Sequence, residues 1–238
     1  MGKTIQLGEI SADVIQKDIK NIHLSVYPPT GAVRISAPLR MDLETIRVFA
    51  LTKLGWIRKQ RNILQGQERE TAREYLDRES HYLWGKRHLL KIVESNSTPL
   101  VRVEHSDLVL QVRPGADLMR RHSTMDRWYR QQLREASSPL IAHWERQLDV
   151  SVTKLIIRKM KTRWGSCTPA SQTIRLNLEL VKKPPECLEY IIVHELAHMI
   201  EHTHNSRFVG LMNQFLKKWQ FYREELNRLP VKHEEWTY

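Results

Sequence analysis

Residues 188–198 read Leu-Glu-Tyr-Ile-Ile-Val-His-Glu-Leu-Ala-His, and they constrain the fold more than any other part of the chain. The first six of these residues are mostly apolar and predict a helix that is buried in a core. Residues four apart lie on one face of a helix, so His194 and His198 can both reach a single cation. Glu195 lies beside the first histidine, where it can take a proton from a water that the cation activates.

A cation held by two histidines needs a third ligand, and two more histidines follow in the chain. On a continuing helix His202 would lie about 12 Å beyond His194, which is too far for both to bind one ion. His204 follows polar residues that can end the helix and turn the chain back, so we favour His204. An acidic ligand further along, Glu224 or Glu225, is a weaker alternative.

The segments around this helix also carry clear patterns. Residues 155–157 predict a short strand, and residues 174–180 alternate between apolar and polar and predict an edge-like strand. The helix with the two histidines is predicted to span about 186–201. Residues 208–219 carry apolar side chains three and four apart, which predicts a final helix facing a core.

The first half of the chain is patterned as a β-rich module. Two alternating runs, residues 22–26 and 33–37, flank a Pro-Pro-Thr-Gly break and predict a hairpin. Asp42 is the predicted N-cap of a helix that continues to about Gly66. Short strands are predicted within residues 82–112.

Residues 117–148 predict a long basic helix that is interrupted or ends near Pro139.

From these predicted strands and helices together we expect an α+β protein with two domains. Residues 1–115 form a β-rich N-terminal module with one long helix, and residues 116–238 form the domain that carries the histidines.

The composition favours a soluble globular protein whose positive charge would attract anionic partners. The 238 residues include 38 Lys and Arg against 27 Asp and Glu, a formal net charge of +11. Hydrophobic residues make up 41%, which argues against a disordered or fibrous chain. Residues 151–183 hold eight basic residues and one acidic residue, a local +7 that would favour acidic protein segments or proteins held on nucleic acid.

The two cysteines, Cys167 and Cys187, show no CxxC pairing, so we expect buried or free thiols rather than a disulfide or a cysteine metal site. No apolar run approaches the roughly 20 residues that a membrane-spanning helix needs. We expect a soluble cytoplasmic protein without a membrane partner.

Four motifs in this order resemble the YgjP-like zinc metallopeptidases over about residues 155–220: Arg163-Trp-Gly-Ser-Cys167, Ile174-Arg-Leu-Asn177, His194-Glu-Leu-Ala-His198 and His204-Asn-Ser-Arg-Phe208. The segments 20–24 and 33–38 are also similar to that family and extend the likeness over most of the chain. The related SprT-like and WLM peptidases share the HExxH helix and a following histidine, and some of them cleave proteins crosslinked to DNA.

The resemblance implies a zincin-like peptidase domain in residues 116–238. It implies that His194, His198 and His204 bind Zn²⁺ and that Glu195 is the catalytic base. Glu201 stands where metzincins, which share this histidine spacing, have a glycine that ends the helix. This departure argues against a metzincin.

Four further residues, Arg163, Trp164, Arg175 and Asn177, are candidates to bind substrate or to support the metal ligands. An edge strand in this region can pair with an extended substrate through backbone hydrogen bonds, without sequence specificity. The alternative is that Trp164 and Gly165 only pack a turn under the helix.

The function expected from these features is zinc-dependent hydrolysis of peptide bonds in a protein or peptide substrate. One alternative is a DNA-associated protease, recruited by the basic surface to DNA-bound or DNA-crosslinked proteins. Another is a non-catalytic metal-binding adaptor, although a purely structural zinc site is normally closed by four protein ligands and has no need of Glu195.

Overall fold

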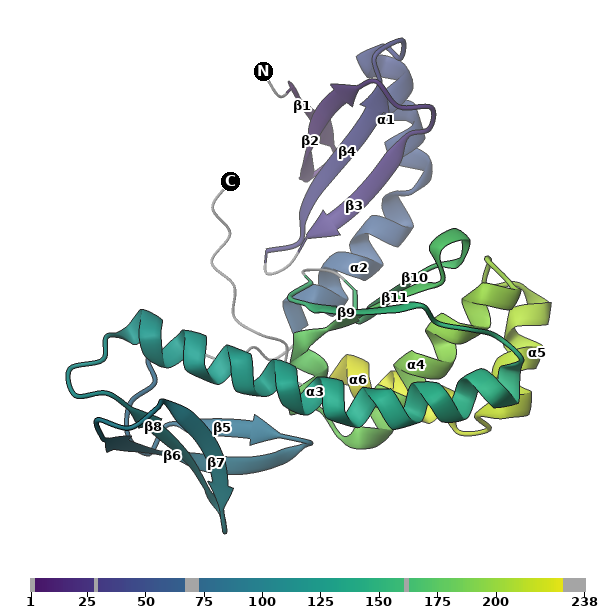
Figure 1. Ribbon diagram of the computed structural model, residues 1–238. Coiled ribbons are helices and arrows are strands. Elements are labelled where there is room, and N and C mark those ends of the chain that lie inside the picture. Colours follow the sequence, from purple (N-terminus) through teal and green to yellow (C-terminus); the bar gives the residue numbers. More distant parts are fainter. Residues whose placement is uncertain (1–2, 28–29, 67–72, 161–162, 229–238) are drawn as a thin grey trace. The chain divides into compact units, whose positions relative to one another are not determined.

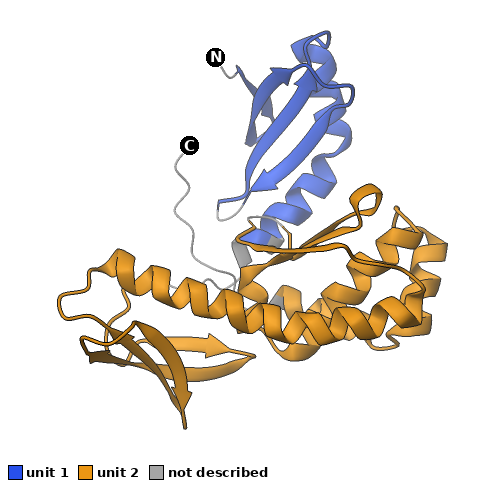
Figure 2. Cartoon of the chain, viewed as in Figure 1, with its two compact units in different colours: residues 1–70, 233–238 blue, residues 71–232 orange. Residues whose placement is uncertain are grey.

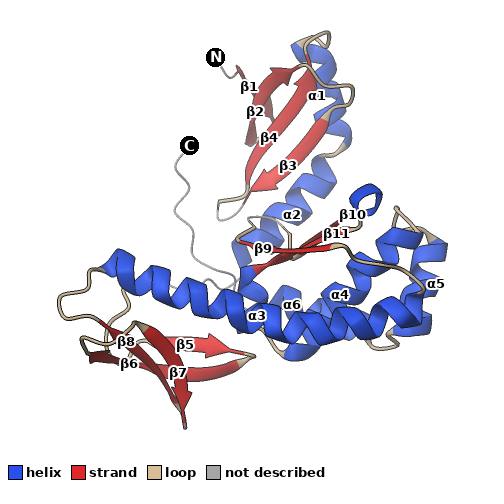
Figure 3. Ribbon diagram, viewed as in Figure 1, coloured by secondary structure: helices blue, strands red, loops and turns tan. Residues whose placement is uncertain are grey.

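The computed structural model describes the chain in four stretches, residues 3–27, 30–66, 73–160 and 163–228. In these stretches the chain forms six α-helices and three small sheets (Figures 1 and 3), which confirms the α+β class. Residues 1–70 fall in one compact unit and residues 71–232 form the other (Figure 2).

The first unit is built on a four-stranded sheet of order β1-β2-β4-β3. Its strands are β1 (Lys3–Leu7), β2 (Ile10–Lys17), β3 (His23–Tyr27) and β4 (Ala32–Pro38). Strands β3 and β4 are antiparallel, which confirms the predicted hairpin. The prolines of its predicted turn, residues 28–29, lie outside the described residues. Strands β1 and β2 were not predicted from the sequence.

Helices α1 (Leu43–Thr52) and α2 (Leu54–Gly66) complete this unit. Asp42 is the N-cap as predicted, because its carboxylate accepts the Thr45 N–H at 2.7 Å. The single helix predicted to Gly66 is wrong. The helix ends at Lys53, whose N–H donates to the Ala50 carbonyl, and the poor helix former Gly55 follows two residues later.

The second unit begins with a four-stranded sheet of order β5-β6-β8-β7. Its strands are β5 (Ser80–Leu83), β6 (Lys86–Glu94), β7 (Leu100–Glu104) and β8 (Asp107–Val112), and they confirm the short strands predicted there. The boundary expected at residue 115 falls after β8, within this compact unit, and the division into two functional domains stays a prediction.

Helix α3 (Leu118–Leu148) is continuous, so the predicted interruption at Pro139 is wrong. Buried side chains recur along one side of this helix at three- and four-residue steps: Met125, Tyr129, Leu133, Ser137, Ile141, Trp144 and Leu148. Pro139 lies on the exposed side. The packing of the buried stripe on both sides of the proline therefore outweighs its local cost.

A three-stranded sheet of order β10-β11-β9 comes next. Its strands are β9 (Lys154–Arg158), β10 (Gly165–Thr168) and β11 (Thr173–Asn177). Strand β11 lies in the middle, so the edge position predicted for residues 174–180 is wrong, and β10 is an edge strand.

The strand predicted over residues 174–180 also ends early, at Asn177, and a 3-10 turn follows it over Leu178–Lys182. The Asn177 side chain accepts the Glu179 N–H at 3.2 Å and so caps this turn. Leu178 and Leu180 are buried all the same, which is why their alternation looked like a strand.

Three helices close the unit: α4 (Pro185–Ile200), α5 (Ser206–Phe215) and α6 (Trp219–Arg228). Helix α4 confirms the prediction over 186–201, whereas the single final helix is wrong because the chain turns between α5 and α6. Helices α3, α5 and α6 and strand β10 all pack on α4, which places α4 at the centre of the core. Within the described residues, no helix combines the length and the apolar character needed to cross a bilayer.

Replacement of Pro139 by alanine should stabilise the protein. The change restores a backbone N–H inside α3 and removes a ring that disfavours the helix, and we expect the free energy of unfolding to rise by about 2 kcal/mol. Urea unfolding measures this. Ala142→Gly, at an exposed position of the same helix, is the control and should lower it by about 1 kcal/mol. A Pro139→Ala protein less stable than the wild type would contradict this account of α3.

Candidate metal centre

Helix α4 holds its polar residues in place by burying most of its surface. It begins at two prolines, of which Pro185 occupies the first turn, where the missing N–H costs nothing. Its apolar side chains are buried in the core: Cys187, Leu188, Ile191, Ile192, Val193 and Leu196. His194 and His198 therefore emerge together on the strip of the helix that the core leaves uncovered.

The end of α4 turns the chain back without a glycine. Glu201 adopts an extended conformation, and its carboxylate accepts both the N–H and the hydroxyl of Thr203, at 3.1 and 3.0 Å. The Glu201 carbonyl lies 3.0 Å from Nδ1 of His198. This contact favours a proton on Nδ1, which leaves Nε2 of His198 free to bind a metal.

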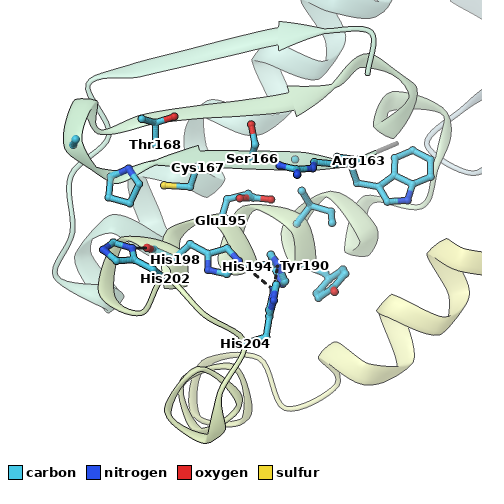
Figure 4. Close-up of a pocket in the computed structure, with 15 residues that line it drawn as sticks. Arg163, Ser166, Cys167, Thr168, Tyr190, His194, Glu195, His198, His202 and His204 are labelled. Atoms are coloured by element: carbon cyan, nitrogen blue, oxygen red, sulfur yellow. Dashed lines mark hydrogen bonds between the residues drawn. The ribbon is translucent and has the colours of Figure 1, made fainter. Parts of the chain in front are cut away.

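The turn brings His204 against the two helical histidines (Figure 4). Nε2 of His204 lies 3.1 Å from Nε2 of His194 and 3.1 Å from Nε2 of His198. Among the described residues, these three form the one group of His, Cys, Asp or Glu side chains placed to share an ion. His202 is not in the group: its Nδ1 lies 3.1 Å from the His198 carbonyl. Glu224 and Glu225 are not in it either.

The three imidazoles fit a metal ion. Nitrogen ligands about 2.05 Å from a tetrahedral ion are separated by about 3.3 Å, close to the spacings seen here. Burial, and then the charges of His198 and His204, lower the pKa of His194 to about 3. Burial also lowers the pKa of His204. Both rings are therefore neutral at physiological pH, the form that binds a cation.

Phe208 supports all three histidines from one side. Its ring centroid lies 5.0 Å from that of His194, 4.6 Å from that of His198 and 4.7 Å from that of His204. Asn205 caps α5 by accepting the Phe208 N–H at 3.0 Å, which fixes the ring just after His204. In the sequence Phe208 belongs to an apolar stripe and ends the motif that begins at His204, but no role at the metal was predicted for it. Its position four residues after His204 was the available signal.

Glu195 points from α4 toward β10 and is only 5% exposed. Burial raises its pKa to about 7, while the charge of Arg163 and a hydrogen bond from the Cys167 backbone N–H act in the opposite direction. Figure 4 shows the carboxylate between the β10 residues and the histidines. A carboxyl group with a pKa near neutrality is suited to accept and return a proton.

An open pocket of about 880 Å³ lies over these residues. One wall is formed by the segment from Arg163 to Ala170, which includes β10, and the other by α4 and the turn to His204. Cys167 lines it, and burial raises the pKa of the thiol to about 11, so this cysteine stays protonated and outside the histidine group.

Tyr190 is a pocket residue for which the sequence pattern predicted no role at the site. It lies one helical turn before His194, and the two rings meet edge to face at 5.8 Å. The spacing of four residues was the signal that could have identified it.

The four further candidates separate into two pairs. Arg163 and Trp164 line the pocket, whereas Arg175 and Asn177 do not. Arg175 donates from Nη1 to the Thr168 hydroxyl at 2.7 Å, across from β11 to β10. The Asn177 amide donates to the carbonyls of Met160 and Arg163, both at 2.9 Å. Arg175 and Asn177 thus hold the wall of the pocket in position.

Comparison with known proteins identifies the family. Residues 20–229 match the family described as YgjP-like, metallopeptidase domain. No match was found among the curated proteins. Among solved structures, the metallopeptidase zymogen of Pyrococcus abyssi abylysin is 24% identical over 39% of this chain and 97% of its own, with a TM-score of 0.35. The zymogen of Methanocaldococcus jannaschii jannalysin is 23% identical over 37% of this chain and 90% of its own, with a TM-score of 0.34. The match over residues 20–229 shows that the chain belongs to the YgjP-like family of metallopeptidases.

Proposed function

We propose that this metal-dependent peptidase is a zinc enzyme of the zincin type, in which Glu195 activates the attacking water. The convergence of three Nε2 atoms beside a buried carboxyl group, in an open pocket, supports the proposal most strongly. The ligands are His194, His198 and His204. The remaining side of the group faces the pocket, as a catalytic site requires.

The chemistry follows from the position of Glu195. A Zn²⁺ ion, when bound, lowers the pKa of a water to about 7 and polarises the substrate carbonyl. Glu195 takes one proton from the water as the water oxygen bonds to the carbonyl carbon. It then gives this proton to the amide nitrogen as the C–N bond breaks, so the products are a carboxyl group and an amine.

Strand β10 supports a binding mode for the substrate backbone. Trp164, Ser166 and Thr168 turn their backbone groups toward β11, as the bond from the Asn177 N–H to the Trp164 carbonyl at 2.9 Å indicates. The alternating residues Gly165 and Cys167 therefore direct theirs away from the sheet, toward the pocket. An extended peptide can pair with this edge through the N–H and C=O of Gly165 and the C=O of Cys167.

The structure adds little support for the two alternative functions, a DNA-associated protease and a non-catalytic metal-binding adaptor. Of the described basic residues within 151–183, only Arg163 lines the pocket, and Lys161 lies outside the described residues. Two others form ion pairs, Lys159 with Asp126 and Lys182 with Glu179. Action on DNA-bound proteins stays a prediction. An adaptor role does not explain why a proton-accepting carboxyl group lies beside an open metal site.

Replacement of Glu195 by glutamine should strongly slow turnover and leave the metal bound. The amide keeps the size of the side chain but cannot accept a proton, and we expect kcat to fall by a factor of about 100 to 10,000. Peptide cleavage with and without a chelator, together with elemental analysis, measures both properties. Glu186→Gln, in the exposed first turn of the same helix, is the control and should keep full activity. Full activity in the Glu195→Gln protein would exclude this mechanism.

Replacement of His204 by alanine should remove the metal, because only two of the three converging nitrogens remain. We expect metal affinity to fall by a factor of at least 100, as measured by competition with a chromophoric chelator. His202→Ala is the matched control, since it removes a neighbouring imidazole that lies outside the group, and it should keep the metal. Unchanged occupancy in the His204→Ala protein, or loss in the His202→Ala protein, would show that the ligand set is different.

A further inference from the structure

Gly165 lies where β10 passes directly over Glu195. The residue is buried, and a Cβ atom added to it would lie 2.6 Å from Oε1 and 2.9 Å from Cγ of Glu195. The same atom would lie 2.9 Å from Cγ2 of Ile191, one turn earlier on α4. Real Cβ contacts are not this short, so no side chain fits here unless a neighbour moves.

We propose that Gly165 is a positioning residue for the proposed reaction: the absence of its side chain allows β10 to lie against Glu195 and hold the carboxylate in its working place. The inference rests on the proposed function and adds to it a requirement at one position of β10.

The need for glycine is one of space and not of backbone conformation. Gly8, Gly31, Gly85 and Gly115 have positive φ angles, which favour glycine by themselves. Gly165 is not among these residues, so its backbone is one that other amino acids can adopt. The constraint at this position therefore comes from the side chains of α4.

Both sides of this contact are held firmly. On one side β10 is paired with β11, where Gly165 lies opposite the buried Leu176. On the other side Ile191 is part of the core, and the Cys167 N–H interacts with the Glu195 carboxylate and lowers its pKa. Of β10, Ile191 and Glu195, the Glu195 side chain is the most easily moved, because the bonds toward its carboxylate can still rotate.

An added methyl group would therefore displace the Glu195 carboxylate, or push β10 away from α4 and so separate the Cys167 N–H from that carboxylate. Either change moves the proton acceptor relative to the water. The metal ligands are not among the atoms nearest to the added group. We thus expect catalysis to be lost while the metal site is kept.

The first experiment compares Gly165→Ala with the wild type in metal content, kcat and KM. We expect bound zinc to be unchanged, kcat to fall by a factor of about 100, as for a misplacement of about 1 Å, and KM to change by less than about threefold. Gly210→Ala is the matched control, since an added Cβ there meets nothing within 4 Å, and it should behave as the wild type. A Gly165→Ala protein with its zinc bound and wild-type kcat would overturn the proposal.

The second experiment needs no activity, so it separates this inference from the proposed function. Thermal unfolding is compared for the wild type, Gly165→Ala, Glu195→Ala and the double variant. Gly165→Ala should lower Tm in the wild-type background and lower it less in the Glu195→Ala background, where the space of Oε1 and Cγ is vacated. An equal decrease in both backgrounds would show that the contact with Glu195 is not what requires glycine. A wild-type protein that cleaves no peptide would instead refute the proposed function, with this coupling still measurable.

Discussion

The burial of helix α4 is the constraint on which the rest of the molecule depends. A carboxyl group in this helix loses water, and the rise of the Glu195 pKa to about 7 corresponds to a cost on the order of 3 kcal/mol for keeping it ionised. Each Leu, Ile or Val buried beside it contributes about 1.5–3 kcal/mol, and five such residues of α4 are buried. The apolar face therefore outweighs the cost of the polar one, and the helix holds a reactive group that would be unstable alone.

The turn after α4 extends this rigidity to the third histidine. Glu201 acts twice, because its carbonyl contacts Nδ1 of His198 and its carboxylate caps Thr203. The same few residues thus orient a histidine on the helix and return the chain toward it. Phe208 then packs against all three rings, so the core and these hydrogen bonds together place the imidazoles.

The sequence predicted those features that depend on local spacing and missed those that depend on packing at a distance. The positions of His194 and His198 on one helix face follow from the helical repeat alone, and the return to His204 follows from polar residues that end a helix. The continuity of α3 through Pro139 does not, because it comes from a buried stripe on both sides of the proline. The requirement for Gly165 was also hidden, since nothing near it in the sequence reveals that β10 crosses α4.

The contact between β10 and Glu195 bears on substrate recognition as well as on proton transfer. If a peptide lies along β10 as proposed, the Cys167 N–H is directed toward the Glu195 carboxylate rather than toward the peptide. The strand ends at Thr168, and the next residue, Pro169, has no N–H to offer. Backbone pairing is then restricted to Gly165 and the Cys167 carbonyl, too few groups to supply much affinity. Selection among peptides must accordingly depend on side chains that line the pocket, and Arg163 is the charged one closest in sequence to the strand.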